Sequence, residues 1–404
     1  MLKRFLSFFL CFAAAFTVTA SSMAGSDAYY AEAASVEAPN YYYNQLSEDA
    51  QKVYDILRKT VFECRESVTI RAEIAQEDFD MIAELIALHD PMTFNIEDIM
   101  ASNITRNLVN FEISYIYDKE TYDEMVSAYE KRADKILSKL TDNMTAYEKI
   151  KKIHDLIISN AEYDLDSPAN ENLYGTLVRK KGKCDGYAKT FSYICGRAGI
   201  ETVTVIGHDL SDQSDVLHMW NKVNYKGKWY NVDTTWDDPV SNMRDNTKYD
   251  FFMVSDSELQ KSHKEDNLSF KVPKATDNSK NYFKVYKKYA EDLESAESIM
   301  KKELKSAVKK EKACISFQCS SKEVFDEVKK YVLNTRKVST LLHGVKKSNK
   351  TNLADTIYSY NFNENQYIVK LLVFYEDTDL DYYFSDLDTV SSNMLNVLAN
   401  YGIE

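Results

Sequence analysis

Apolar residues recur at helical spacing through much of the first third of the chain. They predict a helix over 48–64 with Ser47 as its N-cap, and further helices over 76–89 and 120–140. Between the last two, apolar and polar residues alternate in the run LVNFEISYIYD, which is typical of a strand. Residues 25–140 are therefore predicted to form a mainly helical N-terminal region.

The middle of the chain combines helical and strand patterns. A capping box made by Thr145 and Glu148 predicts the start of one helix. A second helix is predicted to begin at Cys184, where apolar residues recur at helical spacing until Gly199 supplies a stop. Two strand-like runs follow, joined by a turn that contains Gly227. This order predicts a helix packed on an antiparallel sheet.

A polar linker after Pro273 separates the last part of the chain. The pattern there reads as a helix, the strand KACISFQC, a capping box from Ser320 to Glu323 that opens another helix, and the strand QYIVKLLVFYE. Helices and strands in this order predict a small α+β domain over residues 273–404.

The first residues have the pattern of a secretory signal peptide. Lys3 and Arg4 precede an apolar run over 5–15, and small residues follow it. Residues 1–24 are therefore assigned to the signal, and the mature chain is expected to be secreted or held at the cell surface. No later stretch reaches the roughly 20 apolar residues of a membrane span, so we expect no stable span.

Charge and ligand patterns exclude several classes of partner. The formal net charge is −13 for the whole chain, and removal of Lys3 and Arg4 with the signal makes the mature chain more acidic still. A nucleic-acid partner is not expected, because such sites need a clustered basic face. No CxxC pair and no pair of histidines at ligand spacing occurs. We therefore expect no metal and no cofactor.

Five cysteines remain after removal of the signal, an odd number that indicates at least one free thiol. Cys195 belongs to the apolar stripe of the helix that begins at Cys184. At a rise of 1.5 Å per residue the two lie about 16 Å apart, too far for a disulfide. Cys184 is therefore left free to react.

Glycine and tryptophan gather in the same segment as Cys184. Seven of the ten glycines fall between Gly175 and Gly227, and all three tryptophans fall within 17 residues. Because glycine is used where the backbone turns or approaches another group closely, this segment is expected to have tight geometry.

A cysteine at a helix N-terminus is suited to nucleophilic chemistry. The unpaired N–H groups and the positive end of the helix dipole favour a thiolate and can stabilise an oxyanion. Such a nucleophile needs a base and a group that orients the base. If the hairpin loop has an even number of residues centred on Lys226 and Gly227, His218 pairs with Thr235 and Asp233 lies diagonally adjacent on the same face. Cys184, His218 and Asp233 then form a nucleophile, base and orienting residue.

Other residues in this segment have competing interpretations. His208 closes a strand before an acidic loop and is a weaker candidate for the base than His218. Asp237 and Asp238 precede a proline and are interpreted as turn residues. His263 is interpreted as a structural or surface residue.

Tyr174 and the tryptophans are assigned by their size and position. Tyr174 is a candidate donor to the oxyanion, and a buried core position is an equal alternative. Trp220, two residues from His218 on the same strand face, is a candidate wall of the cleft. Trp229 and Trp236 are interpreted as core residues because of the area that each buries.

Three motifs in order resemble those of the transglutaminase-like superfamily, whose fold is related to that of papain-type cysteine proteases. They are the helix with YEKIKKIHDLI, the segment YGTLVRKKGKCDGYAKTFSYICGRAGI and the hairpin HMWNKVNYKGKWYNVDTTWDDP. The resemblance covers about residues 141–265 and matches Cys184 to the nucleophile, His218 to the base and Asp233 to the residue that holds the imidazole. It implies an α+β fold with a catalytic core over 141–272. The calcium-binding insertions of the animal cross-linking enzymes have no counterpart here, so calcium dependence is not carried over.

Two functions from different classes follow as hypotheses. In the first, the chain is an exported cysteine enzyme that transfers acyl groups from protein or peptide amides, by cross-linking to an amine or by hydrolysis. In the second, it is a surface-assembly or binding protein that keeps the fold with little turnover. An intact set of Cys184, His218 and Asp233 favours the enzyme, because a scaffold has no need for it.

Overall fold

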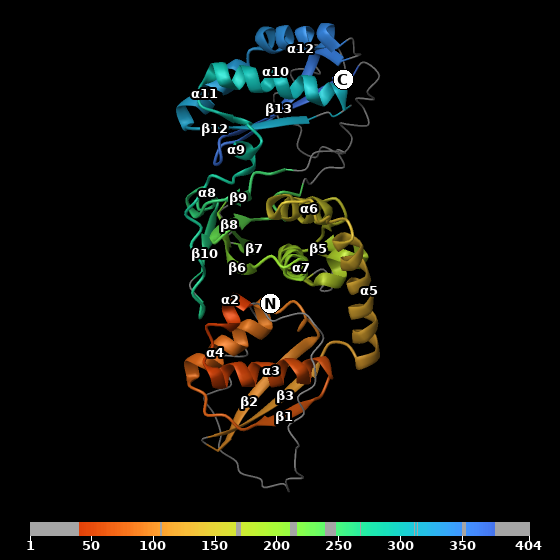
Figure 1. Cartoon of the computed structure of the whole chain (residues 1–404), viewed down its shortest axis with the longest axis vertical. Coiled ribbons are helices and arrows are strands. Elements are labelled where there is room, and N and C mark those ends of the chain that lie inside the picture. Colours follow the sequence, from red (N-terminus) through yellow and green to blue (C-terminus); the bar gives the residue numbers. More distant parts are fainter. Residues whose placement is uncertain are drawn as a thin grey trace. The chain divides into compact units, whose positions relative to one another are not determined.

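The structure is a computed structural model that divides into two compact units (Figure 1). The first unit holds the described residues up to Thr235 together with His263–Ala275, and the second holds Trp236–Ser262 and the described residues from Thr276 onward. The predicted signal peptide, residues 1–24, lies outside the described residues, and the expected boundaries at residues 140 and 272 stay predictions. The described residues are 40–105, 107–166, 171–210, 216–238, 248–266, 268–310, 312, 314–349 and 353–375.

The N-terminal part of the first unit packs helices against a three-stranded antiparallel sheet of order β1-β3-β2. The predicted helices and the predicted strand, which is β3, are present, and the cap at Ser47 is confirmed by its bond from the Ala50 N–H. The flanking strands β1 and β2 were not predicted. The elements of this part are α2 (Asn40–Tyr43), α3 (Glu48–Phe62), β1 (Ser67–Ile70), α4 (Gln76–Glu84), the π-helical η2 (Leu85–His89), β2 (Ile96–Thr105), β3 (Leu108–Tyr115) and α5 (Lys119–Leu137).

A buried hydrogen-bond network joins this N-terminal part to the rest of the unit. The Tyr42 hydroxyl donates to the Thr204 carbonyl at 2.8 Å, and His89 Nδ1 lies 2.6 Å from the Thr204 hydroxyl. His89 Nε2 is in turn 3.1 Å from the Glu84 carboxylate. Because buried polar groups are costly to leave unpaired, this network fixes the N-terminal part against strand β6, which carries Thr204.

The remainder of the first unit packs helices on an antiparallel sheet. Within this unit the strand order is β10-β6-β7-β8, and α7 packs against β6 and β7. The capping box at Thr145 and Glu148 is present, and Gly199 adopts φ +72° just after α7, as a helix stop requires. The elements are α6 (Ala146–Ile158), β4 (Glu162–Tyr163), η4 (Gly175–Arg179), β5 (Lys181–Gly182), α7 (Cys184–Arg197), β6 (Thr202–Asp209), β7 (Val216–Tyr225), β8 (Lys228–Val232) and β10 (His263–Glu265).

The β7–β8 hairpin has the even loop on which the expected approach of Asp233 to His218 depends. Lys226 and Gly227 both have positive φ, as a two-residue turn between twisted strands requires. The pairs run from Tyr225 with Lys228 to Asn221 with Val232, so the loop is even. This register leaves the residues beyond Val232 beside the strand that carries His218.

The tryptophans are placed differently from the prediction. Trp220 is 1% exposed, whereas Trp229 and Trp236 are only partly buried. Trp220 lies on β7 in the middle of the sheet, where its ring packs against His218, against His263 of β10 and close to Gly207 of β6. Trp229 lies near the hairpin end and contacts Tyr41, with ring centroids 5.1 Å apart. Trp229 and Trp236 are thus less buried than the core positions expected for them, whereas the role of Trp220 beside a cleft stays a prediction.

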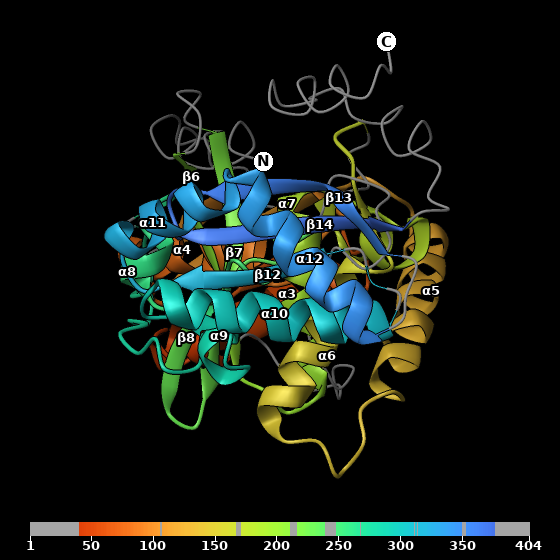
Figure 2. The same cartoon turned by 90° about the horizontal axis from the view of Figure 1, so that it is seen from above.

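The second unit contains a four-stranded sheet of order β11-β12-β14-β13 with helices packed on it. Helices α10 and α12 lie side by side over this sheet (Figures 1 and 2). The expected α+β character is confirmed. The N-cap of α11 is Ser321 and not Ser320, and both α12 and β13 were not predicted. The elements are β9 (Phe252–Val254), α8 (Asp256–Leu259), α9 (Tyr282–Val285), β11 (Tyr289–Ala290), α10 (Leu293–Lys309), β12 (Cys314–Cys319), α11 (Lys322–Val332), α12 (Thr335–Asn349), β13 (Leu353–Asn363) and β14 (Ile368–Tyr375).

Among the helices of the described ranges, none combines the length and the apolar character that a bilayer crossing needs.

Candidate active site

Cys184 is the first residue of α7, and it is partly exposed. The N-cap residue Lys183 has extended backbone and makes no capping bond with its side chain. The cysteine also borders a small apolar cluster that includes Ala188 of the same helix and Met219 of β7. Cys184 therefore lies at a helix N-terminus, beside an apolar cluster, and remains partly exposed.

All five cysteines of the described chain are free thiols: Cys64, Cys184, Cys195, Cys314 and Cys319. Cys195 and Cys319 are buried, and burial raises the pKa of both thiols. Burial likewise raises the pKa of Cys64 and Cys314. These four cysteines are therefore held in the protonated, unreactive form at neutral pH.

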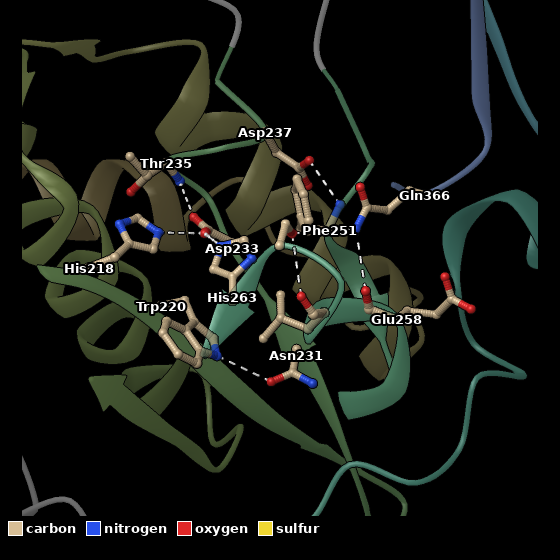
Figure 3. Close-up of polar contacts among 12 residues, drawn as sticks. His218, Trp220, Asn231, Asp233, Thr235, Asp237, Phe251, Glu258, His263 and Gln366 are labelled. Carbon is tan, nitrogen blue, oxygen red and sulfur yellow. Dashed lines mark hydrogen bonds and ion pairs between the residues drawn. The ribbon is translucent and has the colours of Figure 1, made fainter. Parts of the chain in front are cut away.

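His218 lies between Cys184 and Asp233. Its Nε2 atom is 2.7 Å from Asp233 Oδ2 (Figure 3). Burial alone lowers the pKa of His218. The Asp233 charge, the bond to Asp233 and a hydrogen bond to Cys184 outweigh it and raise the pKa to about 10. Because Nε2 is engaged with Asp233, Nδ1 is the ring nitrogen that remains for Cys184.

Asp233 is fully buried and accepts hydrogen bonds on both of its oxygens. Oδ1 accepts from the Thr235 backbone N–H at 2.9 Å, and Oδ2 faces the ring nitrogens of His218 and His263. Burial raises the pKa of the Asp233 carboxyl, but the charge of His218 and the bonds from both histidines bring it well below its usual range. Asp233 is therefore a carboxylate that orients His218 and stabilises its protonated form.

His263 is the main residue that the sequence analysis missed. It was interpreted as a structural or surface residue, but it is 1% exposed and its Nε2 lies 3.1 Å from Asp233 Oδ2. It stands 30 residues after Asp233, outside the three motifs and between the polar residues Ser262 and Lys264. No local pattern pointed to it, since only the pairing of β10 with β6 brings it to the site.

Trp220 packs against the imidazole rings of both His218 and His263. Its ring is stacked near that of His218 at a centroid distance of 6.1 Å and meets that of His263 edge-on at 5.4 Å. The indole N–H donates to Asn231 Oδ1 at 3.2 Å, which satisfies the polar edge of the ring (Figure 3). Trp220 therefore packs against both histidines and limits the movement of their rings.

Gly207 makes room for this arrangement. It pairs with His218 across β6 and β7, and a Cβ atom at this position would lie 2.0 Å from the Lys264 carbonyl oxygen of β10. The same Cβ atom would lie 2.7 Å from the outer edge of Trp220. The close approach of β10 therefore depends on glycine at position 207, which accounts for part of the glycine enrichment noted in the sequence.

Replacing Gly207 by alanine is expected to lower the free energy of unfolding by roughly 1–3 kcal/mol, because strand β10 or Trp220 must move. Gly196 on α7 provides the matched control, since nothing lies within 4 Å of a Cβ atom built there. Alanine at position 196 is expected to raise stability by about 0.5–1 kcal/mol, as in other helix interiors. Urea unfolding measures both variants, and a Gly207→Ala variant as stable as the wild type would contradict the packing argument.

The other predicted residues lie in different settings. His208 is bonded through Nε2 to Asp266 Oδ2 at 3.1 Å and pairs with Leu217, so its side chain points to the face opposite His218. Tyr174 is half-buried just before η4, and its role stays a prediction. Asp237 is buried within the second unit and accepts from the Phe251 N–H at 3.1 Å, a structural contact.

Two further charged groups lie close to Cys184. Burial raises the pKa of Asp185 to about 6. Burial also lowers the pKa of Lys189, whose charge interacts with Asp185 and Cys184. The negative charge beside Cys184 therefore decreases as the pH falls through about 6.

His218, Asp233 and His263 each bring a metal-binding atom within 4.8 Å of the others. The separations of 2.7 and 3.1 Å between the ring nitrogens and Asp233 Oδ2 are those of hydrogen bonds. Two ligand atoms that bind one ion in tetrahedral geometry, each at about 2.0–2.1 Å from it, would lie farther apart than the 2.7 Å between His218 Nε2 and Asp233 Oδ2. This cluster is therefore described as a hydrogen-bonded unit.

A helix with a half-buried cysteine at its start packs on an antiparallel sheet that carries a histidine and a buried aspartate, the arrangement expected of a transglutaminase-like core. Residues 130–234 match the model of the transglutaminase-like superfamily. The chain therefore contains a transglutaminase-like domain, and the α+β fold with this core is as expected.

Two kyphoscoliosis peptidases, one from mouse and one from human, are similar to this chain in sequence. The mouse protein is 31% identical over 102 residues, which cover 22% of this chain and 15% of that protein. The human protein is 28% identical over 130 residues, which cover 29% of this chain and 20% of that protein. The match thus spans no more than about a fifth of either relative.

A crystal structure of a TGase is also similar, at 14% identity and a TM-score of 0.26, over 45% of this chain and 54% of that one. A likeness this slight supports no inference about function.

Proposed function

We propose that the chain is an exported cysteine enzyme that cleaves the amide bond of a protein or peptide substrate through a thioester on Cys184. The observation that carries the proposal is the contact of one buried imidazole, His218, with both Cys184 and Asp233. Such a buried charged arrangement is costly for a scaffold and suits proton transfer. The similarity of residues 130–234 to the transglutaminase-like superfamily supports the same class of reaction.

The proposed reaction has two halves. The Cys184 thiolate adds to the substrate carbonyl carbon, and the N–H groups at the start of α7 stabilise the oxyanion. Protonated His218 then gives its proton to the leaving nitrogen as the C–N bond breaks, which leaves a thioester and a neutral imidazole. In the second half, His218 removes a proton from water or an amine, and that nucleophile displaces Cys184. Water gives a carboxylic acid, whereas an amine gives a new amide.

The first experiment needs no known substrate. It measures the rate at which iodoacetamide alkylates Cys184 from pH 5 to pH 9, with mass spectrometry to assign the site. The wild type is expected to react well below the usual thiol pKa of about 8.5, and His218→Ala is expected to slow the reaction. The buried Cys319 in the same sample is the internal control. Slow labelling that is indifferent to His218 would remove the enzyme proposal and favour a binding protein with this fold.

A second assay separates the two outcomes of the thioester. The protein is incubated with a glutamine-bearing protein and a labelled primary amine. Incorporation of label indicates cross-linking, whereas release of ammonia or free peptide without incorporation indicates hydrolysis.

Turnover is expected to persist through neutral pH and to fall as the pH rises through about 10. The pKa of His218 is raised, so its protonated form survives to higher pH than in a free imidazole, and its loss removes the proton donor for the leaving nitrogen. The measurement is kcat/KM for amide cleavage between pH 6 and 11, with circular dichroism at each pH to detect unfolding. Loss of activity near pH 7 in a folded protein would contradict this assignment.

A further inference from the structure

We propose that His263 is a positioning residue that holds the Asp233 carboxylate in the orientation that His218 requires. This inference rests on the proposed function, because it concerns the same cysteine and histidine. His263 would not touch the substrate and would act only through Asp233.

The first argument concerns the bonds of Asp233. Asp233 Oδ2 faces two ring nitrogens, His218 Nε2 at 2.7 Å and His263 Nε2 at 3.1 Å. An ionised carboxylate only accepts hydrogen bonds, so both histidines must carry a proton on Nε2. The Thr235 N–H holds the other oxygen. Three donors from three directions therefore fix the plane of the carboxylate, whereas Thr235 and His218 alone would leave one side of Oδ2 without a donor.

The second argument concerns the rigidity of His263 itself. It lies on β10, which pairs with β6 opposite Asp209, and Gly207 permits this strand to approach closely. Its ring meets Trp220 edge-on at 5.4 Å and lies 5.4 Å from the ring of His218. The side chain is completely buried. A donor held by a strand and a tryptophan can orient Asp233 without a large loss of side-chain entropy.

The third argument concerns proton transfer. The bond from His263 lowers the pKa of Asp233 and so keeps it as a carboxylate, whose charge in turn favours the protonated form of His218. The proton is then kept on the imidazole, from which it can reach the leaving nitrogen. His263 would therefore help to keep His218 in the charged, correctly oriented form that stabilises a Cys184 thiolate.

The test compares three variants of the full chain with the wild type in the Cys184 alkylation assay. His263→Phe keeps an aromatic ring and removes the donor, whereas His263→Gln can place an amide N–H near the position of Nε2. His208→Phe is the matched control, because His208 also bonds a carboxylate, Asp266, but points to the other face of the sheet. Near-UV circular dichroism and urea unfolding report the folding of each variant.

His263→Phe is expected to slow alkylation at pH 6 by roughly ten- to a hundred-fold, the effect of one hydrogen bond to a charged group. It should also move the acid limb of the rate profile to higher pH. His263→Gln is expected to recover most of the rate, and His208→Phe should resemble the wild type. A folded His263→Phe variant with the wild-type profile would overturn the inference, as would equal losses in the Phe and Gln variants.

Nitrogen NMR of ¹⁵N-histidine-labelled wild type tests the same point without a variant. The proposal requires a protonated Nε2 on His263, and a non-protonated Nε2 overturns it. If His218→Ala slows labelling but the His263 results fail, only the role of His263 is lost. If the wild type itself labels slowly and His218→Ala has no effect, the proposed function is lost, and the role of His263 with it.

Discussion

Replacing Cys184 by alanine is expected to abolish turnover, with a loss on the order of 10⁵ to 10⁶ in kcat. The proposed thioester requires the sulfur, and a methyl group cannot add to a carbonyl carbon. Substrate binding should survive because Cys184 is small and partly exposed, so little packing is lost. The measurement is amide cleavage or amine incorporation by Cys184→Ala, together with a substrate-binding assay.

Cys64 provides the control for this first prediction. It is also a partly exposed free thiol, and it accepts a weak bond from Asn95 Nδ2 at 3.5 Å, which a serine hydroxyl can replace. Cys64→Ser should keep full activity. Residual activity of more than about a thousandth in Cys184→Ala would show that another group is the nucleophile, because a covalent mechanism leaves only background catalysis once its nucleophile is removed.

Replacing Asp233 by asparagine is expected to reduce kcat by roughly 10⁴-fold. The Thr235 N–H occupies one side of the carboxylate at 2.9 Å, so the asparagine must direct its oxygen there. The NH₂ group of the asparagine then faces His218 Nε2. Because this NH₂ group only donates hydrogen bonds, Nε2 must accept one and cannot carry a proton. The imidazole proton moves to Nδ1, toward Cys184, and His218 can no longer take the thiol proton.

Asp266→Asn is the matched control for Asp233→Asn, because Asp266 also pairs with a histidine, His208, at 3.1 Å. That pair is partly exposed, and its loss should change turnover by less than about two-fold, as for other exposed ion pairs. Both variants are compared by kcat and by the pH dependence of alkylation. A fully active Asp233→Asn variant would indicate that the tautomer of His218 does not depend on Asp233.

The β7–β8 hairpin illustrates what could be predicted from the sequence. The turn residues Lys226 and Gly227 define a two-residue loop, and strand periodicity then determines which residues share a face. That reasoning brought Asp233 next to His218, and their atoms lie 2.7 Å apart. Register over a short hairpin is a local property, so the length of the loop was the one condition that the sequence left open.

The start of α7 is a second local property. Helical spacing of apolar residues after Cys184 and a glycine with positive φ at Gly199 mark its two ends. The position of Cys184 at the N-terminus follows directly. The N-cap of α11 at Ser321, one residue from the predicted Ser320, marks the limit of this reasoning, because adjacent serines offer the same pattern.

Burial and long-range contacts could not be predicted from local sequence patterns. Trp220 is buried and Trp229 is not, although both lie on strands of one hairpin. The difference comes from what packs against each ring: His218, His263 and the close strands β6 and β10 surround Trp220, whereas Trp229 contacts Tyr41 near the hairpin end. Side-chain size alone could not distinguish the two positions.

The sequence by itself determined the start of α7 at Cys184, the two strands of the hairpin and the order of the three motifs, since each depends on residues close together in the chain. The tertiary structure alone decided the environment of Asp233. His263 reaches it only because the chain returns as β10 to pair with β6 after the segment Trp236–Ser262 of the second unit. Gly207 leaves room for β10 to approach β6 closely, and the ring of His263 packs edge-on against Trp220. Contacts of this kind depend on packing between distant segments, and no spacing pattern along the chain encodes them.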